Sequence, residues 1–341
     1  MKRSRHDRMR DGEGMMRLFT RAFLAAAVAA GASFAAGAAS AQQWPTRAVK
    51  IITPQPPGTG IDVSCRVFAE KLSQRWGQAA VVENRPGADG AIGVGAFIGA
   101  NDDHTLLCSF GGPITILPFT TQTKLSYDPA TDLKPISTIV DFVQLFAVSA
   151  TMGVDTLDAF VKKVRSEPGK HNWASTQGLP LLIMSSFIRS ANLEMAYVPY
   201  TALTPALQDL AQGRIQLYAT TYSSFLPLIQ SNQIRVLLTL NSQRARQLPD
   251  VPTAAEAGLP HLTVVSFNGF FGARSMSDAI RDKIAADIQA VGKDSDVAAK
   301  LENLGIAIRT TSPAEFSKMI AEQSATVQSI LKATGGMPGQ K

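Results

Sequence analysis

Histidine and cysteine are scarce in this chain, with four histidines and two cysteines among 341 residues. So few of these ligands exclude a disulfide-rich scaffold, and their spacing is not typical of a metal site. The motifs H-E-x-x-H, C-x-x-C, G-x-S-x-G and G-x-x-x-x-G-K-[ST] are also missing. We therefore predict no metal, no cofactor and no catalytic residue, and we expect a binding protein rather than an enzyme.

Long runs of one charge are missing as well. Lysine and arginine number 33 against 27 acidic residues, a formal net charge of +6, but residues 1–41 alone contribute +4 of it. Residues 42–341 therefore carry only +2, and their basic side chains are scattered along the chain. This pattern argues against nucleic acid as a partner.

The apolar stretch near the start is too short for a typical membrane anchor. Arg17 and Arg21 precede an apolar stretch, residues 23–30, which continues in small residues and ends at Ala39-Ser40-Ala41. This order of basic, apolar and small residues is typical of a secretory signal peptide. A transmembrane helix fits less well, because the apolar part is rich in alanine and glycine. We expect residues 1–41 to be removed and the remainder to reach the periplasm without an anchor.

Cys65 and Cys108 both lie in the part expected to be exported. Export would allow a disulfide bond, because the periplasm is oxidising. Their distance in the sequence does not establish a bond, however, and we favour two separate buried thiols as the interpretation. Whether the two cysteines are bridged stays open at this point.

Strand-like and helix-like segments alternate along residues 42–341. The predicted strands are 49–53, 79–83, 105–109, 172–175, 195–199, 215–220, 234–240, 263–271 and 306–310. The predicted helices are 61–76, 91–100, 156–165, 181–190, 205–211, 277–291 and 313–331. Such alternation predicts the α/β class, with mostly parallel sheets flanked by helices.

Two lobes are expected, because a chain of this length exceeds the usual size of one core. The long apolar segment 136–149 could pass from one lobe to the other, and the strand 263–271 could return. We therefore predict a discontinuous first lobe, 42–143 and 264–341, and a second lobe, 144–263.

Three loops follow predicted strands, which is where ligands bind in open α/β sheets. The loop residues that we select are Pro57, Gly58, Thr59, Gly60, Asp62, Ser175, Thr176, Gln177, Thr220 and Thr221. In the first loop the glycines would present backbone N–H groups at a helix start, where an anion can bind without lysine or arginine. The alternative interpretation is a set of ordinary turns, with Asp62 only capping its helix.

The glycine-rich stretch 87–95 precedes the second predicted helix. It lacks the G-x-G-x-x-G frame of a dinucleotide site. Close packing of the helix on its sheet explains these glycines better.

A set of short motifs in a fixed order resembles the Bug family of solute receptors of tripartite tricarboxylate transporters. The motifs are Trp44-Pro45-Thr46-Arg47, the loop 57–62, Val82-Glu83-Asn84-Arg85-Pro86-Gly87-Ala88, Tyr127-Asp128-Pro129, Pro168-Gly169-Lys170, Val198-Pro199-Tyr200, Leu248-Pro249-Asp250-Val251-Pro252-Thr253 and Glu256-Ala257-Gly258-Leu259-Pro260. The resemblance covers nearly all of residues 42–341.

This resemblance implies two lobes of the type II periplasmic-binding-protein fold, hinged around a cleft. It implies a small ligand, usually a carboxylate, that is held by loop backbone and ordered water. It also implies delivery to integral-membrane permease subunits, and it adds Phe110, Gly111 and Tyr200 to the candidate ligand-binding residues. We expect a monomer. The alternatives are a sensing module for a membrane signalling protein and an exported α/β enzyme acting on small acids.

The chain departs from the family pattern at several loops. Thr59 and Ile61 replace a glycine and a hydroxyl residue of the first loop, and the second loop continues into Leu179-Pro180-Leu181-Leu182. Thr220 stands where an aspartate is often found. These changes remove polar side chains, so we expect a ligand with an apolar or aromatic body and a single carboxylate rather than a citrate-like polyacid.

Overall fold

The computed structural model describes residues 44–176, 178–200, 202–302, 304–334 and 336. The predicted signal peptide, residues 1–41, lies outside the described residues, as does Gln177. The chain divides into two units after Thr46, and the fold described below belongs to the second unit, residues 47–341.

The larger of two sheets has the strand order β11-β4-β10-β3-β1-β2. Its strands are β1 (Val49–Thr53), β2 (Ala80–Asn84), β3 (Thr105–Phe110), β4 (Leu133–Phe142), β10 (Asn268–Ala273) and β11 (Ile306–Ile308). β1 pairs in parallel with β2 and β3, whereas β10 pairs antiparallel with both β3 and β4, and β11 antiparallel with β4.

The smaller sheet has the order β7-β6-β8-β5-β9. Its strands are β5 (Gln144–Ser149), β6 (His171–Ser175), β7 (Met195–Tyr197), β8 (Leu217–Thr221) and β9 (Ile234–Thr239). β6 pairs in parallel with β7 and β8, and β5 antiparallel with β8 and β9. The predicted α/β class and the two sheets are confirmed, but both sheets are mixed rather than mostly parallel. The reason is that β4, β5 and β10 carry the chain between the sheets and run against their neighbours.

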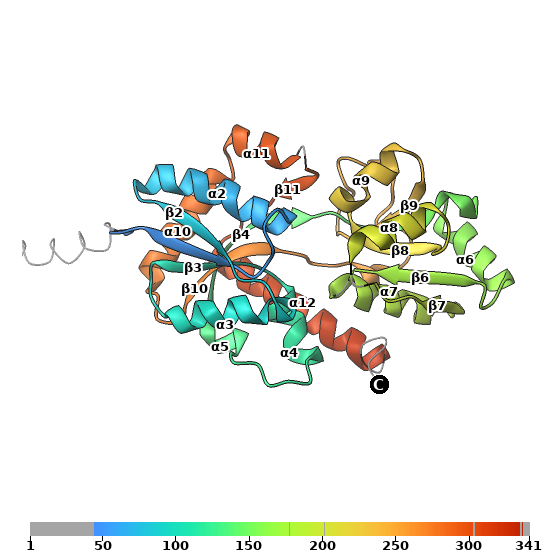
Figure 1. Ribbon diagram of the computed structural model, residues 1–341, viewed down its shortest axis with the longest axis horizontal. Coiled ribbons are helices and arrows are strands. Elements are labelled where there is room, and N and C mark those ends of the chain that lie inside the picture. The colour runs from blue at the N-terminus through green and yellow to red at the C-terminus, as the bar shows by residue number, and fades with distance from the viewer. Residues whose placement is uncertain (1–43, 177, 201, 303, 335, 337–341) are drawn as a thin grey trace, which may run out of the picture. The chain divides into compact units, whose positions relative to one another are not determined.

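Helices cover both faces of each sheet (Figure 1). Those that accompany the larger sheet are α2 (Gly60–Trp76), α3 (Ala91–Ala100), α4 (Leu117–Thr120), α5 (Pro129–Asp132), α10 (Asp278–Val291), α11 (Ser295–Glu302) and α12 (Pro313–Thr334). Those of the smaller sheet are α6 (Leu157–Ser166), α7 (Leu179–Ser190), α8 (Leu203–Ala211) and α9 (Tyr222–Gln230). Short 3-10 helices are η1 (Ala88–Gly90), η3 (Ala150–Met152) and η4 (Pro260–Leu262), and η2 (Gly112–Ile116) is a short π-helix.

Helix α2 shows why the local sequence folds as it does. Thr59 caps its start by accepting the N–H of Asp62, and Gly77 ends it in a left-handed conformation with φ 63°. Phe68 and Leu72, four residues apart, are both fully buried on its inner side.

Helix α3 packs close to the sheet at Gly93. A Cβ atom on this residue would lie 2.7 Å from the carbonyl oxygen of Arg85 and 2.7 Å from Pro54. The contact confirms that close packing requires glycine at this position.

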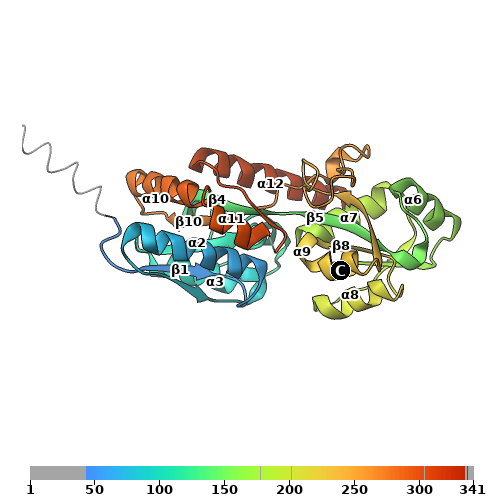
Figure 2. The same cartoon turned by 90° about the horizontal axis from the view of Figure 1, so that it is seen from above.

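The two sheets are joined directly at Val143, which separates β4 from β5. Helix α12 makes a further connection, because Phe316 and Met319 belong to the core of the larger sheet and Val327 and Ile330 to that of the smaller (Figure 2). The connection between the two sheets therefore includes a helix as well as the crossing strands.

A disulfide bond joins Cys65 of α2 to Cys108 of β3, with Cα atoms 6.2 Å apart. Both side chains are fully buried. The favoured interpretation of two separate thiols is therefore wrong. The bond depends on the tertiary fold, because α2 lies across the sheet beside β3. Two residues that are 43 apart in the sequence therefore become neighbours.

Candidate functional site

A cavity of about 510 Å³, here called the central cavity, lies between the two sheets. The starts of α2, α7 and α9 reach it, together with the residues that cross between the sheets. Seven of the predicted site residues line it: Thr59, Gly60, Phe110, Gly111, Thr176, Thr220 and Thr221. Loops from both sheets therefore meet at one cavity.

The first loop is held from behind by Asp62, which is only 2% exposed. Its carboxylate accepts the N–H of Gly58 at 2.9 Å, the Nδ2 of Asn84 at 2.7 Å and the Nε of Arg66 at 3.0 Å. Burial by itself would raise the pKa of Asp62, but hydrogen bonds from Arg66, Gly58 and Asn84 outweigh it and hold the pKa below its usual value. Asp62 therefore braces the first loop through the N–H of Gly58, besides lying in the first turn of α2.

Helix α7 begins without a side-chain cap. Gly178 occupies the N-cap position with φ 85° and ψ −137°, a conformation that favours glycine. The helix dipole and the N–H groups of the first turn, apart from Pro180, which has none, thus remain available to an anion in the central cavity, which Gly178 and Leu179 line. In the same loop, the hydroxyl of Thr176 donates to the carbonyl of Ala219 at 3.3 Å.

Strand β8 ends at Thr220 and Thr221, and α9 follows at once. Thr221 caps α9 by accepting the N–H of Ser224, so the predicted loop is a helix start rather than a plain turn. The Thr220 side chain lines the cavity, and its hydroxyl has no hydrogen-bond partner among the described residues. Thr220 thus offers a hydroxyl that a ligand can engage.

Five predicted residues lie outside the cavity lining: Pro57, Gly58, Asp62, Ser175 and Tyr200. Ser175 donates to the carbonyls of Thr176 and Ala219. The Tyr200 hydroxyl donates to Asp209 at 2.6 Å, and burial raises its pKa to about 12. Asp62, Ser175 and Tyr200 thus bond to neighbouring residues rather than line the cavity, whereas Pro57 and Gly58 are exposed.

The crossing segment contributes residues that the sequence did not reveal. Phe142 and Gln144 line the central cavity, and Ser266 and Gln323 join them from the returning chain and α12. The Oε1 atom of Gln144 is buried without a hydrogen-bond partner. The only sequence signal was the apolar run itself, because which side chains of a crossing strand face a cavity depends on the packing of both sheets.

No charged side chain lines the central cavity among the described residues. Phe110, Ile116, Phe142, Leu179 and Phe267 form apolar walls, and hydroxyl and amide groups supply the polar part. A polyanion would find no counter-charge here, whereas a single carboxylate could rest on helix N-termini.

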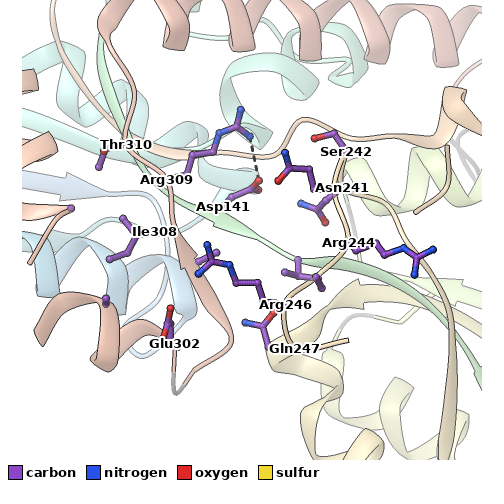
Figure 3. A pocket seen from close by; sticks show the side chains of 16 residues that line it. Asp141, Asn241, Ser242, Arg244, Arg246, Gln247, Glu302, Ile308, Arg309 and Thr310 are labelled. Carbon is purple, nitrogen blue, oxygen red and sulfur yellow. Dashed lines mark hydrogen bonds and ion pairs between the residues drawn. The ribbon is translucent and has the colours of Figure 1, made fainter. Parts of the chain in front are cut away.

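A second hollow of about 650 Å³, the rear cavity, lies on the other side of the crossing strand. Because successive strand side chains point to opposite faces, Asp141 and Val143 line the rear cavity while Phe142 and Gln144 line the central one. Figure 3 shows Asp141 bonded to Arg309, at 3.4 Å, with Arg246 directed toward the β11 side. Burial raises the pKa of Asp141. The hydrogen bond from Ser266 and the charge and hydrogen bond of Arg309 lower the pKa, but burial outweighs them.

The rear cavity is the larger hollow, but it lacks the features of a ligand site in this fold. It reaches none of the helix starts that border the central cavity. Two of its arginines are already engaged, Arg309 by Asp141 and Arg244 by Glu256 at 2.9 Å. The central cavity is therefore the better candidate for the ligand site.

In the described part of the chain, no cluster of three or more His, Cys, Asp or Glu side chains could hold a metal ion. Within the same residues, every helix falls short of the length and apolar character that a bilayer crossing requires.

Comparison with protein families gives one extended match. A model described as the tripartite tricarboxylate transporter family receptor matches residues 64–336. Protein BugT of Bordetella pertussis is 32% identical over 224 residues, which are 65% of this chain and 69% of that protein. A UPF0065 protein from the tcbD-tcbE intergenic region of Pseudomonas sp. strain P51 is 28% identical over 292 residues, 84% of this chain and 86% of that one.

Solved structures agree with this match. One described as a periplasmic transporter has a TM-score of 0.74 and 29% identity, covering 86% of this chain and 99% of its own. A Rhodopseudomonas palustris protein, solved with adipate, has a TM-score of 0.75 and 26% identity over the same shares. The fold is thus that of periplasmic binding proteins.

Proposed function

The chain belongs to the receptor family of tripartite tricarboxylate transporters, and from this premise we propose which ligand it captures and how. The resemblance to Bug receptors drawn from the sequence is confirmed by the same findings. The proposed ligand is a small organic molecule with one carboxylate and an apolar or aromatic body. The two lobes would close on it, selecting a closed state that the free protein already visits.

The observation that carries this proposal is a cavity that combines helix N-termini from both sheets with a lining free of charged side chains among the described residues. An anion at the starts of α2 and α7 would meet backbone N–H groups and the positive ends of two helix dipoles. The hydroxyl of Thr220 adds a donor. The carboxylate would therefore be bound without forming a salt bridge.

The apolar body would contact Phe110, Ile116 and Phe142. Burial of such groups contributes about 25 cal/mol per Å² of apolar surface, which favours a hydrocarbon chain or ring over a second carboxylate. The R. palustris protein of similar fold was solved with adipate, an acid with an extended aliphatic body, which supports an elongated ligand.

We propose these ligand-binding residues, some in direct contact and some supporting a loop: Pro57, Gly58, Thr59, Gly60, Asp62, Phe110, Gly111, Ser175, Thr176, Gln177, Tyr200, Thr220 and Thr221. To them we add Phe142 and Gln144 from the crossing segment, because both line the central cavity. The two lobes would comprise 42–143 with 264–341 and 144–263, with the hinge at Val143 and the end of α12 resting on the second lobe.

We propose export to the periplasm through the signal peptide in residues 1–41. The bridge between Cys65 and Cys108 supports this location, because disulfide bonds persist in oxidising compartments. In the periplasm the receptor would act as a monomer and deliver its ligand to integral-membrane permease subunits. It would catalyse no reaction itself.

The test is calorimetric titration of the purified protein with hexanoate, benzoate, adipate and citrate. We expect binding of acids with an apolar body and none of citrate; the reverse order would contradict the ligand assignment. Phe110→Ala should weaken the binding of hexanoate or benzoate about tenfold, because it removes an apolar wall of the cavity. Phe119→Ala is the matched control, since Phe119 is 43% exposed and lies outside the cavity lining.

A further inference from the structure

The central cavity continues into a neighbouring hollow of about 470 Å³, here called the side cavity. The two share five lining residues: Gln55, Phe110, Gly112, Ile116 and Gly178. A ligand that fills the central cavity can therefore extend into the side cavity past Phe110 and Ile116. The side-cavity residues that do not also line the central cavity include Asp89 and residues 120–122.

Asp89 is the only ionisable acid or base that lines either cavity among the described residues. It is exposed, and its carboxylate forms no hydrogen bond or ion pair with any described residue. Other acids nearby are already engaged: Asp62 by Arg66 and Glu83 by Arg85. Asp89 is therefore a free negative charge at the end of an otherwise uncharged binding space.

The backbone around Asp89 forms a tight turn beside the side cavity. Asp89 has φ 51° and ψ 29°, and Gly87, Ala88 and Gly90 also have positive φ values. Aspartate is among the few residues other than glycine that tolerate this left-handed region. A Cβ atom on Gly90 would lie 3.0 Å from Pro113, so the turn also sits close against η2.

We propose that Asp89 binds a cationic group at the far end of the ligand, so that the receptor selects an elongated zwitterion. This inference rests on the proposed function, because it takes the carboxylate to lie at the starts of α2 and α7. The apolar part then passes Phe110 and Ile116, and a terminal ammonium group reaches Asp89 in the side cavity.

The acceptors in the side cavity suit an ammonium group. An ammonium carries three N–H donors and needs acceptors for them. Asp89 supplies carboxylate oxygens, and the side-chain amides of Gln55 and Gln122 supply further oxygens in the same lining. A carboxylate in this position would instead face the negative charge of Asp89, so an acid with carboxylates at both ends is disfavoured.

The experiment compares three six-carbon acids, hexanoate, 6-aminohexanoate and adipate, by calorimetric titration. The same comparison is made with 4-methylbenzoate and 4-(aminomethyl)benzoate, which probe a ring. For the unmodified protein we expect each amino acid to bind about threefold to fivefold more tightly than its uncharged counterpart, the range of an exposed ion pair. Adipate should bind more weakly than 6-aminohexanoate.

Asp89→Asn removes the charge and keeps a residue that tolerates positive φ, so the turn should remain folded. In this variant the preference for the amino acids should disappear, while hexanoate should bind as before. Asp250→Asn is the matched control, because Asp250 is exposed and lines neither cavity. It should retain the full preference.

The outcomes separate the two proposals. Equal binding of hexanoate and 6-aminohexanoate, or a preference that survives Asp89→Asn, overturns the role of Asp89 and leaves the monocarboxylate site in place. Failure of every acid in the panel to bind overturns both. Tighter binding of adipate than of 6-aminohexanoate also contradicts the role of Asp89.

Discussion

Replacing Asp62 by asparagine should destabilise the protein and loosen the first loop. The carboxylate accepts hydrogen bonds from Gly58, Arg66 and Asn84, and an amide in its place would turn an N–H group toward one of these donors. Loss of the charge weakens the remaining bonds, although the Arg66 side chain is 47% exposed and can turn to water. We expect a loss of about 2–3 kcal/mol in the free energy of unfolding.

The loss of unfolding free energy in Asp62→Asn should be larger at neutral pH than in acid. Because the folded-state pKa of Asp62 is lowered, its charge stabilises the fold at pH values above the ordinary pKa of 3.8. That contribution disappears as the pH falls through the lowered folded-state value. The difference in unfolding free energy between the unmodified protein and Asp62→Asn should thus be largest at neutral pH and decrease in acid.

Urea unfolding at a series of pH values measures this difference directly. Asp250→Asn serves as the control, because this exposed residue should change the unfolding free energy by less than about 0.5 kcal/mol. A gap between the unmodified protein and Asp62→Asn that stays constant from neutral pH into acid would refute the reasoning. So would an Asp62→Asn variant as stable as the unmodified protein at neutral pH.

Three further changes test other parts of the structure. Replacing Cys65 and Cys108 together by serine opens a link across 43 residues, which should cost about 4 kcal/mol by loop entropy, seen as a lower urea midpoint; an unchanged midpoint would argue against the bridge. Thr220→Val should lower ligand affinity about threefold to tenfold in calorimetry at nearly constant stability, and unaltered affinity would remove Thr220 from the site. Tyr127→Phe should lower the free energy of unfolding by about 1 kcal/mol, because the buried hydroxyl donates to the carbonyl of Pro113 at 2.8 Å. Urea unfolding measures this change, and an unchanged free energy of unfolding would contradict the role of the hydrogen bond.

Local signals in the sequence predicted most elements of the fold. Thr59, Thr156 and Ser277 each cap a helix that the sequence placed within a few residues of its observed start. Helix α9 was missed, since Pro227 and several serines make its sequence read as a loop. Strand direction and the pairing of Cys65 with Cys108 could not be read locally, because both depend on which segments the fold brings together.

Some residues of the candidate site could likewise be predicted from the sequence, and others could not. Loop residues such as Thr59, Thr176 and Thr220 could be selected because strand ends in open α/β sheets border ligands. Phe142 and Gln144 could not be selected from the sequence, because the packing of the two sheets around the crossing strand decides which of its side chains point into the cavity. Asp89 drew no attention in its glycine-rich stretch, where its significance comes from the cavity beside it.

The single strand that separates the central and rear cavities also has a practical use. The proposed closure of the lobes on one side of this strand would change the width of the hollow on the other. A fluorescent dye attached through Ser242→Cys would sit in the rear cavity, outside the space that the ligand occupies. The native cysteines would not compete for the label, because they are bridged and buried. The receptor would then serve as an optical sensor that reports occupancy without added reagents.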